Sequence, residues 1–323
     1  MTTAIADRFA ALLDGKMTDA EARDFLANHD PDGQSLAEAV RAVRARMIAI
    51  DAPPNAIDVC GTGGDGQHTL NVSTAVAIVV AACGVPVAKH GNRAASSLAG
   101  GADTLEALGL DLAKASARAE ETLADMGLAF LFAQAHHPAL ARLGPLRKAL
   151  GKRTILNLTG PMCNPAQVRR QLIGVANMTG FAIFAAVPWG DLGMERVMVV
   201  CGAEGLDELS IAGPSHVFTY GMVAPPSQIT GIITPEDAGL PRHPLDALKG
   251  GDAAFNAREL RAMLRGDPGH NAAYRDAVLL NAAAALMVAG EAQNLRDAVE
   301  ELAEVIDRGL AIALLDCWIA AVH

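Results

Sequence analysis

The chain has 323 residues, of which 51% are hydrophobic and 19% charged, enough for one large domain with a sizeable core and a smaller domain beside it. Acidic residues outnumber basic ones, 36 to 26, which gives a formal net charge of −10. This charge disfavours nucleic acids and anionic membranes as general partners. An anionic substrate would therefore need locally placed cations or bridging metal ions.

The cysteines and the N-terminal residues favour a cytoplasmic protein. None of the five cysteines has C-x-x-C spacing or clusters with histidines, so we expect reduced, mostly buried thiols. The first residues, MTTAIADRFAALLDG, include acids and lack the apolar run of a signal peptide. The longest uncharged apolar run, 75–87, is shorter than the roughly 18–20 residues that a membrane helix needs.

Residues 1–47 have a helical pattern and no strand signal. Thr18 and Glu21 have the spacing of a capping box, and Gly15 stands where the preceding helix would end. Ser35 and Glu38 repeat this spacing ahead of apolar residues that recur at helical intervals. We therefore expect a small amphipathic bundle of helices at this end of the chain.

From Pro53 onward, predicted strands and helices alternate. A strand at 57–60 precedes a glycine-rich loop, and a helix that begins near Ser73 or Thr74 precedes a second strand at 85–91. Further strands are predicted at 128–133, 154–159 and 197–202, and helices at 102–110, 116–127, 136–151 and from 256 to the end. The alternation predicts an α/β fold with a mostly parallel sheet, whose site lies at the carboxyl ends of the strands.

The glycine-rich loop contains a dinucleotide-type motif, because Gly61, Gly63 and Gly66 spell G-x-G-x-x-G. A nicotinamide site would also need an acidic residue about 20 residues later, to bind the ribose hydroxyls. Residues 67–102 contain no Asp or Glu, and six residues, 67–72, separate Gly66 from the predicted start of the helix at Ser73. These two departures argue against NAD(P) as the ligand.

The same strand ends carry groups that suit phosphates. Glycines of the first loop allow close backbone approach to an anion, and small polar residues follow at a predicted helix N-terminus. The second loop brings Lys89, Arg93, Ser96 and Ser97. Further along the chain, Asp207 and Glu208 follow a predicted strand, and adjacent carboxylates can bind Mg²⁺ together with substrate phosphates.

Several blocks in chain order resemble the anthranilate phosphoribosyltransferases of tryptophan biosynthesis. They are GTGGDG…NVSTA, KHGNRAASS, HHPALARLGPLRKALGKRTILNLTGPMCNP, GLDELS and LLNAAAAL, and the similarity runs from about residue 5 to 315. The resemblance implies transfer of the phosphoribosyl group of phosphoribosyl pyrophosphate (PRPP) to the amine of anthranilate, with release of pyrophosphate. The pyrimidine nucleoside phosphorylases are more distantly similar.

The resemblance also implies an architecture and an assembly. A small helical domain, 1–52 with a middle segment near 135–150, would be hinged to a large α/β domain, 53–323. A homodimer would form largely through the helical part. The implied cofactor is Mg²⁺, two ions per subunit, and the implied partners are the small molecules PRPP and anthranilate.

The family motifs imply site residues at matching positions of this chain. Those implied for PRPP are Gly61, Gly64, Asp65, Thr69, Asn71, Val72, Ser73, Thr74, Lys89, His90, Gly91, Asn92, Arg93, Ser96, Ser97 and Gly101. Those implied for anthranilate are Gly61, Asn92, His137 and Arg147, and those for the metal ions are Ser73, Asp207 and Glu208. The family often has Ser or Ala at the position of Gly101, so one hydroxyl contact to PRPP is expected to be absent.

The residues leave several roles open. Arg147 suits the anthranilate carboxylate, because a guanidinium matches carboxylate geometry, but a surface arginine is the alternative. His90 and His137 either touch a substrate or are hydrogen-bonded structural residues. Asp65 would contact PRPP through a metal ion or water, or would shape the loop backbone. Asn281, in an apolar helix, is expected to be a buried structural hydrogen-bonding residue.

Three other functions compete with this interpretation: a pyrimidine nucleoside phosphorylase, an NAD(P) oxidoreductase and a family member that binds PRPP without turnover. The block HHPALARLGPLRKALG and the Asp207–Glu208 pair argue against the phosphorylase. Intact candidate metal and phosphate residues argue against the non-catalytic protein. No strong general base is expected, because an aromatic amine is already neutral at pH 7, so positioning carries much of the catalysis.

Overall fold

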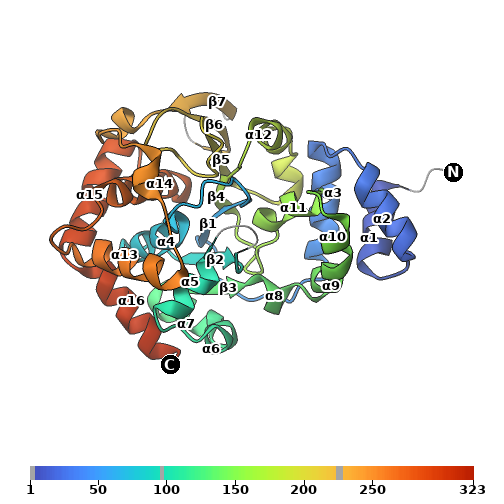
Figure 1. The fold of residues 1–323 in the computed structure, drawn as a ribbon, viewed down its shortest axis with the longest axis horizontal. Helices are drawn as coiled ribbons and strands as arrows, with labels where there is room; N and C mark the ends of the chain where they lie inside the picture. Colours follow the sequence, from blue (N-terminus) through green and yellow to red (C-terminus); the bar gives the residue numbers. More distant parts are fainter. Residues whose placement is uncertain (1–3, 95–97, 223–227) are drawn as a thin grey trace.

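A seven-stranded sheet forms the centre of the computed structural model, which describes residues 4–94, 98–222 and 228–323 (Figure 1). Its order is β3-β2-β1-β4-β5-β6-β7. The strands are β1 Ile57–Gly61, β2 Val87–Gly91, β3 Leu128–Phe132, β4 Arg170–Gly174, β5 Arg196–Gly202, β6 Ser215–Tyr220 and β7 Gln228–Ile233. Strands β1 to β5 are parallel and the last two pair antiparallel, which confirms the predicted mostly parallel sheet.

Helices cover the sheet and extend to both ends of the molecule (Figure 1). In the first part of the chain they are α1 Ile5–Leu13, α2 Asp19–Asn28, α3 Gly33–Arg44, α4 Val72–Ala82, α5 Gly101–Ala107, α6 Leu112–Ala117 and α7 Ala119–Met126. The later ones are α8 Ala133–His136, α9 Pro138–Arg142, α10 Gly144–Leu150, α11 Leu156–Thr159, α12 Met178–Ala185, α13 Ala253–Arg265, α14 Ala272–Ala289, α15 Leu295–Asp307 and α16 Leu310–Ala321. Short 3₁₀ turns lie at Gly160–Met162, Trp189–Leu192, Pro235–Ala238 and Leu245–Leu248.

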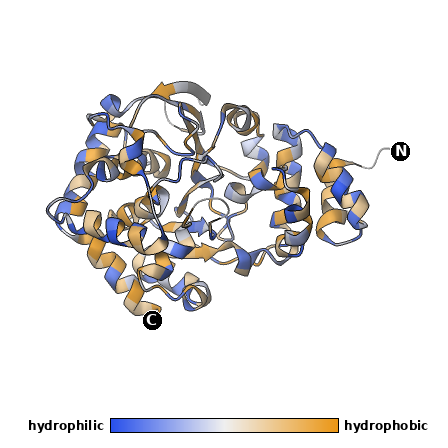
Figure 2. Ribbon diagram, in the orientation of Figure 1, coloured by the Kyte–Doolittle hydropathy of each residue, from blue (hydrophilic) through white to orange (hydrophobic). Residues whose placement is uncertain are grey.

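The parallel strands are nearly all buried because helices lie on both faces of the sheet. On one face, α4 packs against α14, and α14 also contacts β4, β5 and β1. Outer helices such as α15 bury one stripe, including Leu295, Val299 and Ile306, and leave the rest polar, so apolar and polar colours alternate along them (Figure 2).

The N-terminal helices share a core with the other face of the sheet. Phe9, Phe25 and Leu36 belong to one buried cluster with Phe181 of α12 and Val197 of β5. Helices α10 and α11 contact α2 and α3, so the chain returns near residues 144–159 to the helices with which it began (Figure 1). The predicted N-terminal helical region is therefore present.

The helix ends agree with the predicted caps at one place and differ at another. Thr18 and Glu21 form the predicted capping box of α2. The capping box predicted at Ser35 and Glu38 for α3 is wrong. Asp32 is the N-cap, and its carboxylate accepts a hydrogen bond from Ser35 N–H at 2.7 Å, while Ser35 Oγ accepts one from Asp32 N–H at 3.0 Å.

The strand predicted at 154–159 is wrong. Residues Leu156–Thr159 form the short helix α11. At its start, the Asn157 side chain accepts a hydrogen bond from Thr154 N–H at 2.8 Å. The alternating apolar residues of TILNLT pack on α3 as one helical face instead of pairing with a strand. The true neighbour of β1 is β4, whose arginine and glutamine residues obscured its strand pattern.

The helix after the glycine loop begins at Val72, and its N-cap is Asn71, two residues before Ser73. Among the later helices, α14 is long and apolar enough to cross a membrane by length and composition, but 78% of it is buried inside the protein. All five cysteines are free, and Cys60, Cys163 and Cys201 are buried, as expected for reduced thiols.

The α3 cap makes a testable prediction. Asp32→Ala removes the acceptor for Ser35 N–H and is expected to lower the free energy of unfolding by about 1 kcal/mol. Glu38→Ala removes the partly exposed ion pair with Arg41 and the hydrogen bond from Gln34 Nε2, helix-surface contacts that together are worth roughly 0.5 kcal/mol. Urea denaturation followed by circular dichroism measures both. Equal losses in the two variants would contradict the reassigned cap.

Candidate active site

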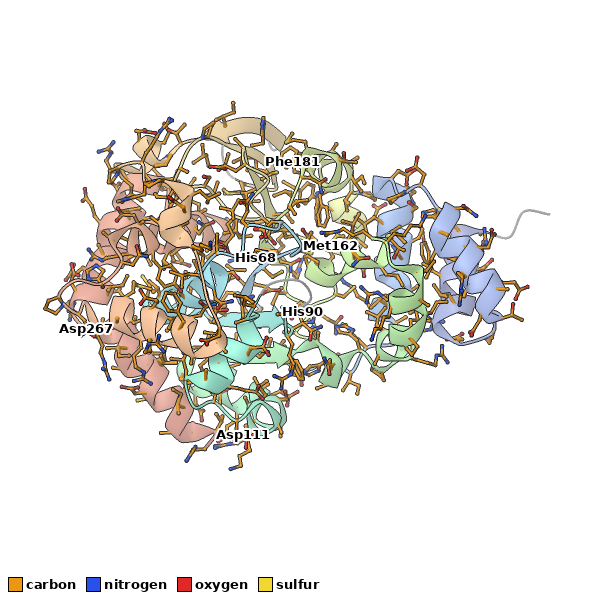
Figure 3. The ribbon with its side chains drawn as sticks, viewed as in Figure 1. His68, His90, Asp111, Met162, Phe181 and Asp267 are labelled. Carbon is orange, nitrogen blue, oxygen red and sulfur yellow. The ribbon has the colours of Figure 1, made fainter. Side chains whose placement is uncertain are left out.

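One cavity of about 720 Å³ opens where β1 and β2 end, and its volume suits a small-molecule ligand. The implied residues that line it are Gly61, Gly64, Asp65, Thr69, Asn71, Ser73, Thr74, Lys89, His90, Gly91, Asn92, Arg93, Gly101, His137, Arg147, Asp207 and Glu208. Two residues on its wall, His68 and His90, lie in the middle of the molecule in Figure 3. Val72 is instead buried in the core, and Ser96 and Ser97 lie outside the described residues.

The ends of β1 and β4 must be glycine because a carboxylate loop passes directly over them. Gly61 and Gly174 are register partners. A Cβ on Gly61 would lie 2.1 Å from Asp207 Oδ2, and one on Gly174 would lie 1.5 Å from the Asp207 carbonyl oxygen. A side chain at 174 would collide with the Asp207 backbone, and one at 61 would displace the Asp207 carboxylate, so the two glycines let Asp207 reach the cavity.

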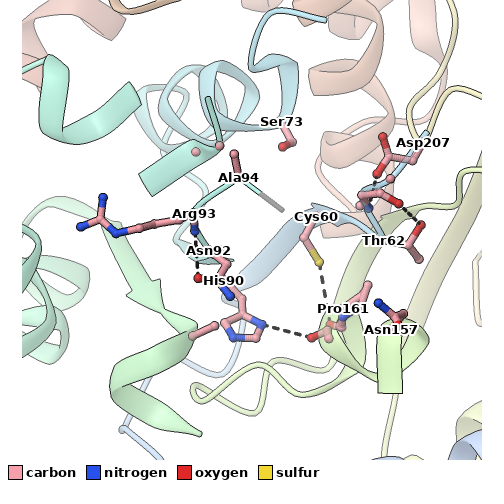
Figure 4. A pocket seen from close by; sticks show the side chains of 18 of the residues that line it. Cys60, Thr62, Ser73, His90, Asn92, Arg93, Ala94, Asn157, Pro161 and Asp207 are labelled. Atoms are coloured by element: carbon pink, nitrogen blue, oxygen red, sulfur yellow. Dashed lines mark hydrogen bonds between the residues drawn. The ribbon is translucent and has the colours of Figure 1, made fainter. Parts of the chain in front are cut away.

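The glycine loop is held by hydrogen bonds to its neighbours. Thr62 N–H donates to Gly174 O at 2.9 Å, and Gly63 N–H donates to Asp207 Oδ2 at 2.7 Å (Figure 4). Arg153 donates to the carbonyls of Gly63 and Gly64 at 3.0–3.1 Å, and its guanidinium occupies the space that a Cβ on Gly64 would need. The loop is therefore fixed from both the sheet and the segment after α10.

Asp65 shapes the loop backbone and also faces another acid. Its Oδ1 accepts a hydrogen bond from Gln67 N–H at 3.1 Å, a local turn that aspartate often makes. Burial, followed by the nearby Asp65 carboxylate, raises the pKa of Asp207 to about 6. The backbone-shaping role that the sequence left open is thus present, beside an electrostatic contact with Asp207.

Glu208 lies at the N-terminus of α4. Its Oε1 accepts a hydrogen bond from Ser73 N–H at 3.0 Å, where the helix dipole favours an anion. Its Oε2 is buried and has no partner among the described residues. Burial, then repulsion from Asp207, raises the pKa of Glu208 well above its usual value. Two adjacent desolvated carboxylates with a free oxygen suit a divalent cation.

The end of β2 places two cations differently. Lys89 is buried, and its ammonium donates a hydrogen bond to His90 O at 3.1 Å. It also acts on the buried Asp58 carboxyl: burial raises the pKa of Asp58, and the charge of Lys89 lowers it. The Arg93 side chain points away from the centre of the cavity (Figure 4). It forms ion pairs with Asp103 and Glu106, so much of its charge is already compensated.

Two histidines meet on the far wall of the cavity. The His90 Nδ1 lies 3.1 Å from Gly160 O, so we place its hydrogen there, and His137 Nε2–H can then donate to His90 Nε2 at 3.3 Å. Burial lowers the pKa of His90 to about 3 and that of His137 to about 4. Both imidazoles are therefore neutral at pH 7, and His137 Nδ1 has no partner among the described residues.

Arg147 is the cation on the same side of the cavity as His137. It lies on α10 and is half-buried, and burial lowers the pKa of its guanidinium. Within the described ranges no ion pair or hydrogen bond engages its side chain, in contrast to Arg93. A desolvated guanidinium without a carboxylate partner favours an anionic ligand.

Asn71 and Gly101 have structural roles at this site. Asn71 Oδ1 accepts from Thr104 Oγ1 and from Asn256 Nδ2, and its own Nδ2 donates to Ala99 O at 3.3 Å. A Cβ on Gly101 would lie 2.9 Å from Thr74 Oγ1. A residue larger than glycine at 101 would therefore need Thr74 to move, which is a local reason for the departure from the family pattern.

Sequence reasoning missed several residues that build the site. Arg153 and Gly174 lie outside the resemblance-based list, and Asn256 comes from a helix more than 180 positions after its partner Asn71. Only Gly174 carried a signal, as a glycine at the end of a short apolar run. In the described part of the chain, no three His, Cys, Asp or Glu side chains are arranged as a complete metal site.

Comparisons with known proteins agree with this arrangement. Residues 53–312 match the glycosyl transferase family, a/b domain. The anthranilate phosphoribosyltransferase of Novosphingobium aromaticivorans is 59% identical over 318 residues, 98% of this chain and 94% of that protein.

Solved structures of such enzymes have the same fold. The anthranilate phosphoribosyltransferase of Thermus thermophilus is 37% identical, with a TM-score of 0.88 over 98% of this chain and 94% of that one. The Saccharomyces cerevisiae enzyme in complex with PRPP and Mg is 28% identical, with a TM-score of 0.87 over 98% and 92%. The yeast enzyme is also known in complex with 4-fluoroanthranilate.

Since the family model covers most of the chain and the Novosphingobium relative matches nearly all of it, the chain belongs to the anthranilate phosphoribosyltransferases, the glycosyltransferases of tryptophan biosynthesis that transfer the phosphoribosyl group of PRPP to the amine of anthranilate.

Proposed function

We propose that this chain performs its family's transfer by holding PRPP and magnesium at the ends of β1, β2 and β5, and anthranilate between His137 and Arg147. The observation that carries the proposal is the single cavity that joins the glycine loop, the Asp207–Glu208 pair and Arg147. Both substrates need to reach one space, because the amine attacks the carbon that pyrophosphate leaves.

The phosphate groups of PRPP would lie against the glycine loop, the loop after β2 and the N-terminus of α4. The N-terminus of α4 favours negative charge, and since Ser73 N–H already donates to Glu208, the Thr74 N–H is the group proposed to face a phosphate. Lys89 supplies a buried positive charge, which is stronger in a low-dielectric setting than on the surface. Among the residues proposed for PRPP, Asn71 and Arg93 would hold the surrounding loops in place, because their side chains already bind protein groups.

Two magnesium ions per subunit would complete the site, one near Ser73 and Glu208 and the other near Asp207 and Glu208. The donor set fits hard cations, which take carboxylate, hydroxyl and phosphate oxygens. The free Glu208 Oε2 and the raised pKa values of both carboxyls indicate that a cation would relieve their repulsion. When bound, magnesium neutralises charge on the pyrophosphate leaving group.

Anthranilate would place its carboxylate toward Arg147 and its amine toward the ribose of PRPP. His137 is neutral and lines the same cavity, so it can contact the ring of anthranilate without adding charge. Asn92 and Gly61 lie on the wall between the two substrate positions. The chain's residues therefore orient a neutral nucleophile, and no side chain has to remove a proton before attack.

The larger-scale roles belong to the same proposal. The helical domain, 1–52 with the segment near 135–150, would carry Arg147 toward or away from the α/β domain, 53–323. A homodimer formed largely through the helical part and a cytoplasmic location follow the family resemblance. The shared core of Phe9, Phe25 and Phe181 supports close packing of the helical part against the sheet.

The metal role predicts a large loss of turnover. Asp207→Ala combined with Glu208→Ala is expected to lower kcat at least 100-fold, since magnesium contributes several kcal/mol to leaving-group stabilisation. Loss of anthranilate fluorescence on addition of PRPP and Mg²⁺ measures the rate. The control is Glu120→Ala with Glu121→Ala, an adjacent acidic pair on the exposed face of α7. Full turnover in the Asp207 and Glu208 double variant would refute the metal assignment.

The anthranilate role predicts a selective change in KM. Arg147→Ala removes a charge-assisted contact worth roughly 1.5–3 kcal/mol, so the KM for anthranilate is expected to rise about 10- to 100-fold. The KM for PRPP is expected to change less than about threefold. Lys148→Ala, an exposed cation on the same helix, serves as the control. An unchanged anthranilate KM in Arg147→Ala would show that another group binds the carboxylate.

A further inference from the structure

The peptide after the two carboxylates is held by a side chain from a distant helix. Asn281 is buried in α14 among apolar residues. Its Oδ1 accepts a hydrogen bond from Leu209 N–H at 2.9 Å, and its Nδ2 donates to Leu209 O at 3.0 Å and to Ala277 O at 2.9 Å. The amide thus pairs with both backbone groups of Leu209, as a neighbouring strand would.

This contact uses the full hydrogen-bonding capacity of the amide nitrogen. Both of its hydrogens are donated, and the carbonyl oxygen accepts from the backbone. Leu209 is only 1% exposed, so water cannot replace the amide as a partner for its N–H and C=O. Asn281 is therefore committed to the backbone of Leu209 and Ala277 and has no free donor for a ligand.

The loop that contains Asp207 and Glu208 is tethered at three points. Gly63 N–H binds the Asp207 carboxylate, and Ser73 N–H binds the Glu208 carboxylate. These two tethers act on the carboxylate groups that a cation would also bind. The Asn281 tether acts on the backbone of the next residue, so cation binding does not compete with it.

A small void makes this backbone tether important. A cavity of about 20 Å³ lies among Ser73, Asp207, Glu208 and Asn281, under the side chains that face the main cavity. It is large enough for about one water molecule, so packing alone does not fill the space beside the two carboxylates. The hydrogen bonds of Asn281 to the Leu209 peptide fix the backbone at this incompletely packed place.

We propose that Asn281 is a positioning residue for the divalent-cation site, which sets the orientation of Glu208 and Asp207 through the Leu209 peptide. The inference rests on the proposed function, because it takes these carboxylates as the metal ligands. Residues that orient metal ligands typically change metal affinity 10- to 100-fold when they are removed. Within the described ranges, Asn281 makes no hydrogen bond to the phosphate-binding backbone of the glycine loop or of α4.

The test separates magnesium-dependent from magnesium-independent binding. Isothermal titration calorimetry measures the affinity for PRPP without anthranilate, once in EDTA and once over a series of MgCl₂ concentrations. In wild type, PRPP affinity is expected to rise with MgCl₂. In Asn281→Leu, which keeps the number and branching of the side-chain heavy atoms but lacks the amide, the half-saturating MgCl₂ concentration is expected to rise 10- to 100-fold. Affinity in EDTA is expected to stay within about threefold of wild type.

Two further variants control for stability. Asn281→Ala tests the same loss with a smaller side chain, and Leu286→Ala truncates a buried residue further along α14 without touching Leu209. Thermal melts rank the stability of all three. Leu286→Ala is expected to melt at a lower temperature than wild type but to keep the wild-type dependence on MgCl₂.

Each outcome decides between the two proposals. If wild-type PRPP affinity does not depend on MgCl₂, the metal role of Asp207 and Glu208 fails, and this inference fails with it. If the PRPP affinity of wild type depends on MgCl₂, and both folded Asn281 variants show the same half-saturating MgCl₂ concentration as wild type, only the positioning role is overturned. Loss of folding in both Asn281 variants would also overturn it, because the amide would then serve stability alone.

Discussion

The close approach of Asp207 to the ends of β1 and β4 is the constraint on which the rest of the site depends. Gly61 and Gly174 stand side by side in the sheet, and neither leaves room for a Cβ beneath the 207–208 loop. Because the loop can descend this far, Asp207 reaches Gly63 N–H and Glu208 reaches the N-terminus of α4. The glycine loop, the first helix of the α/β part and the acidic pair thereby become one surface.

The charges of this surface explain how an acidic chain can handle a polyanionic substrate. Asp207 and Glu208 line the cavity together with Lys89, a buried cation whose charge lowers the pKa of Glu208 against the effect of burial. Arg93, which the sequence places in the same loop, is paired with Asp103 and Glu106. Because the charge of Arg93 is compensated by these ion pairs, the proposed magnesium ions would supply most of the positive charge that stabilises pyrophosphate as it leaves.

Sequence reasoning succeeded where local chemistry decides the structure. The capping box of α2, the glycine loop after β1 and the cations after β2 are short-range patterns, and each has a physical reason at its own position. It failed where packing overrides the pattern. The run at Leu156–Thr159 is apolar enough for a strand but packs as a helix on α3, and Asp32 caps α3 although Ser35 and Glu38 have the expected spacing.

The sequence by itself determined the family, the α/β alternation and a set of site residues, and nearly all of those that the structure describes line the cavity, because these follow from motifs and local periodicity. Only the tertiary structure decided which groups share a contact. It directs Arg93 outward, leaves Arg147 without an ion-pair partner in the described part of the chain, and joins Asn281 to Leu209 across 72 positions. Such pairings depend on how helices and strands pack, and residues far apart in sequence carry no local signal of their distance in space.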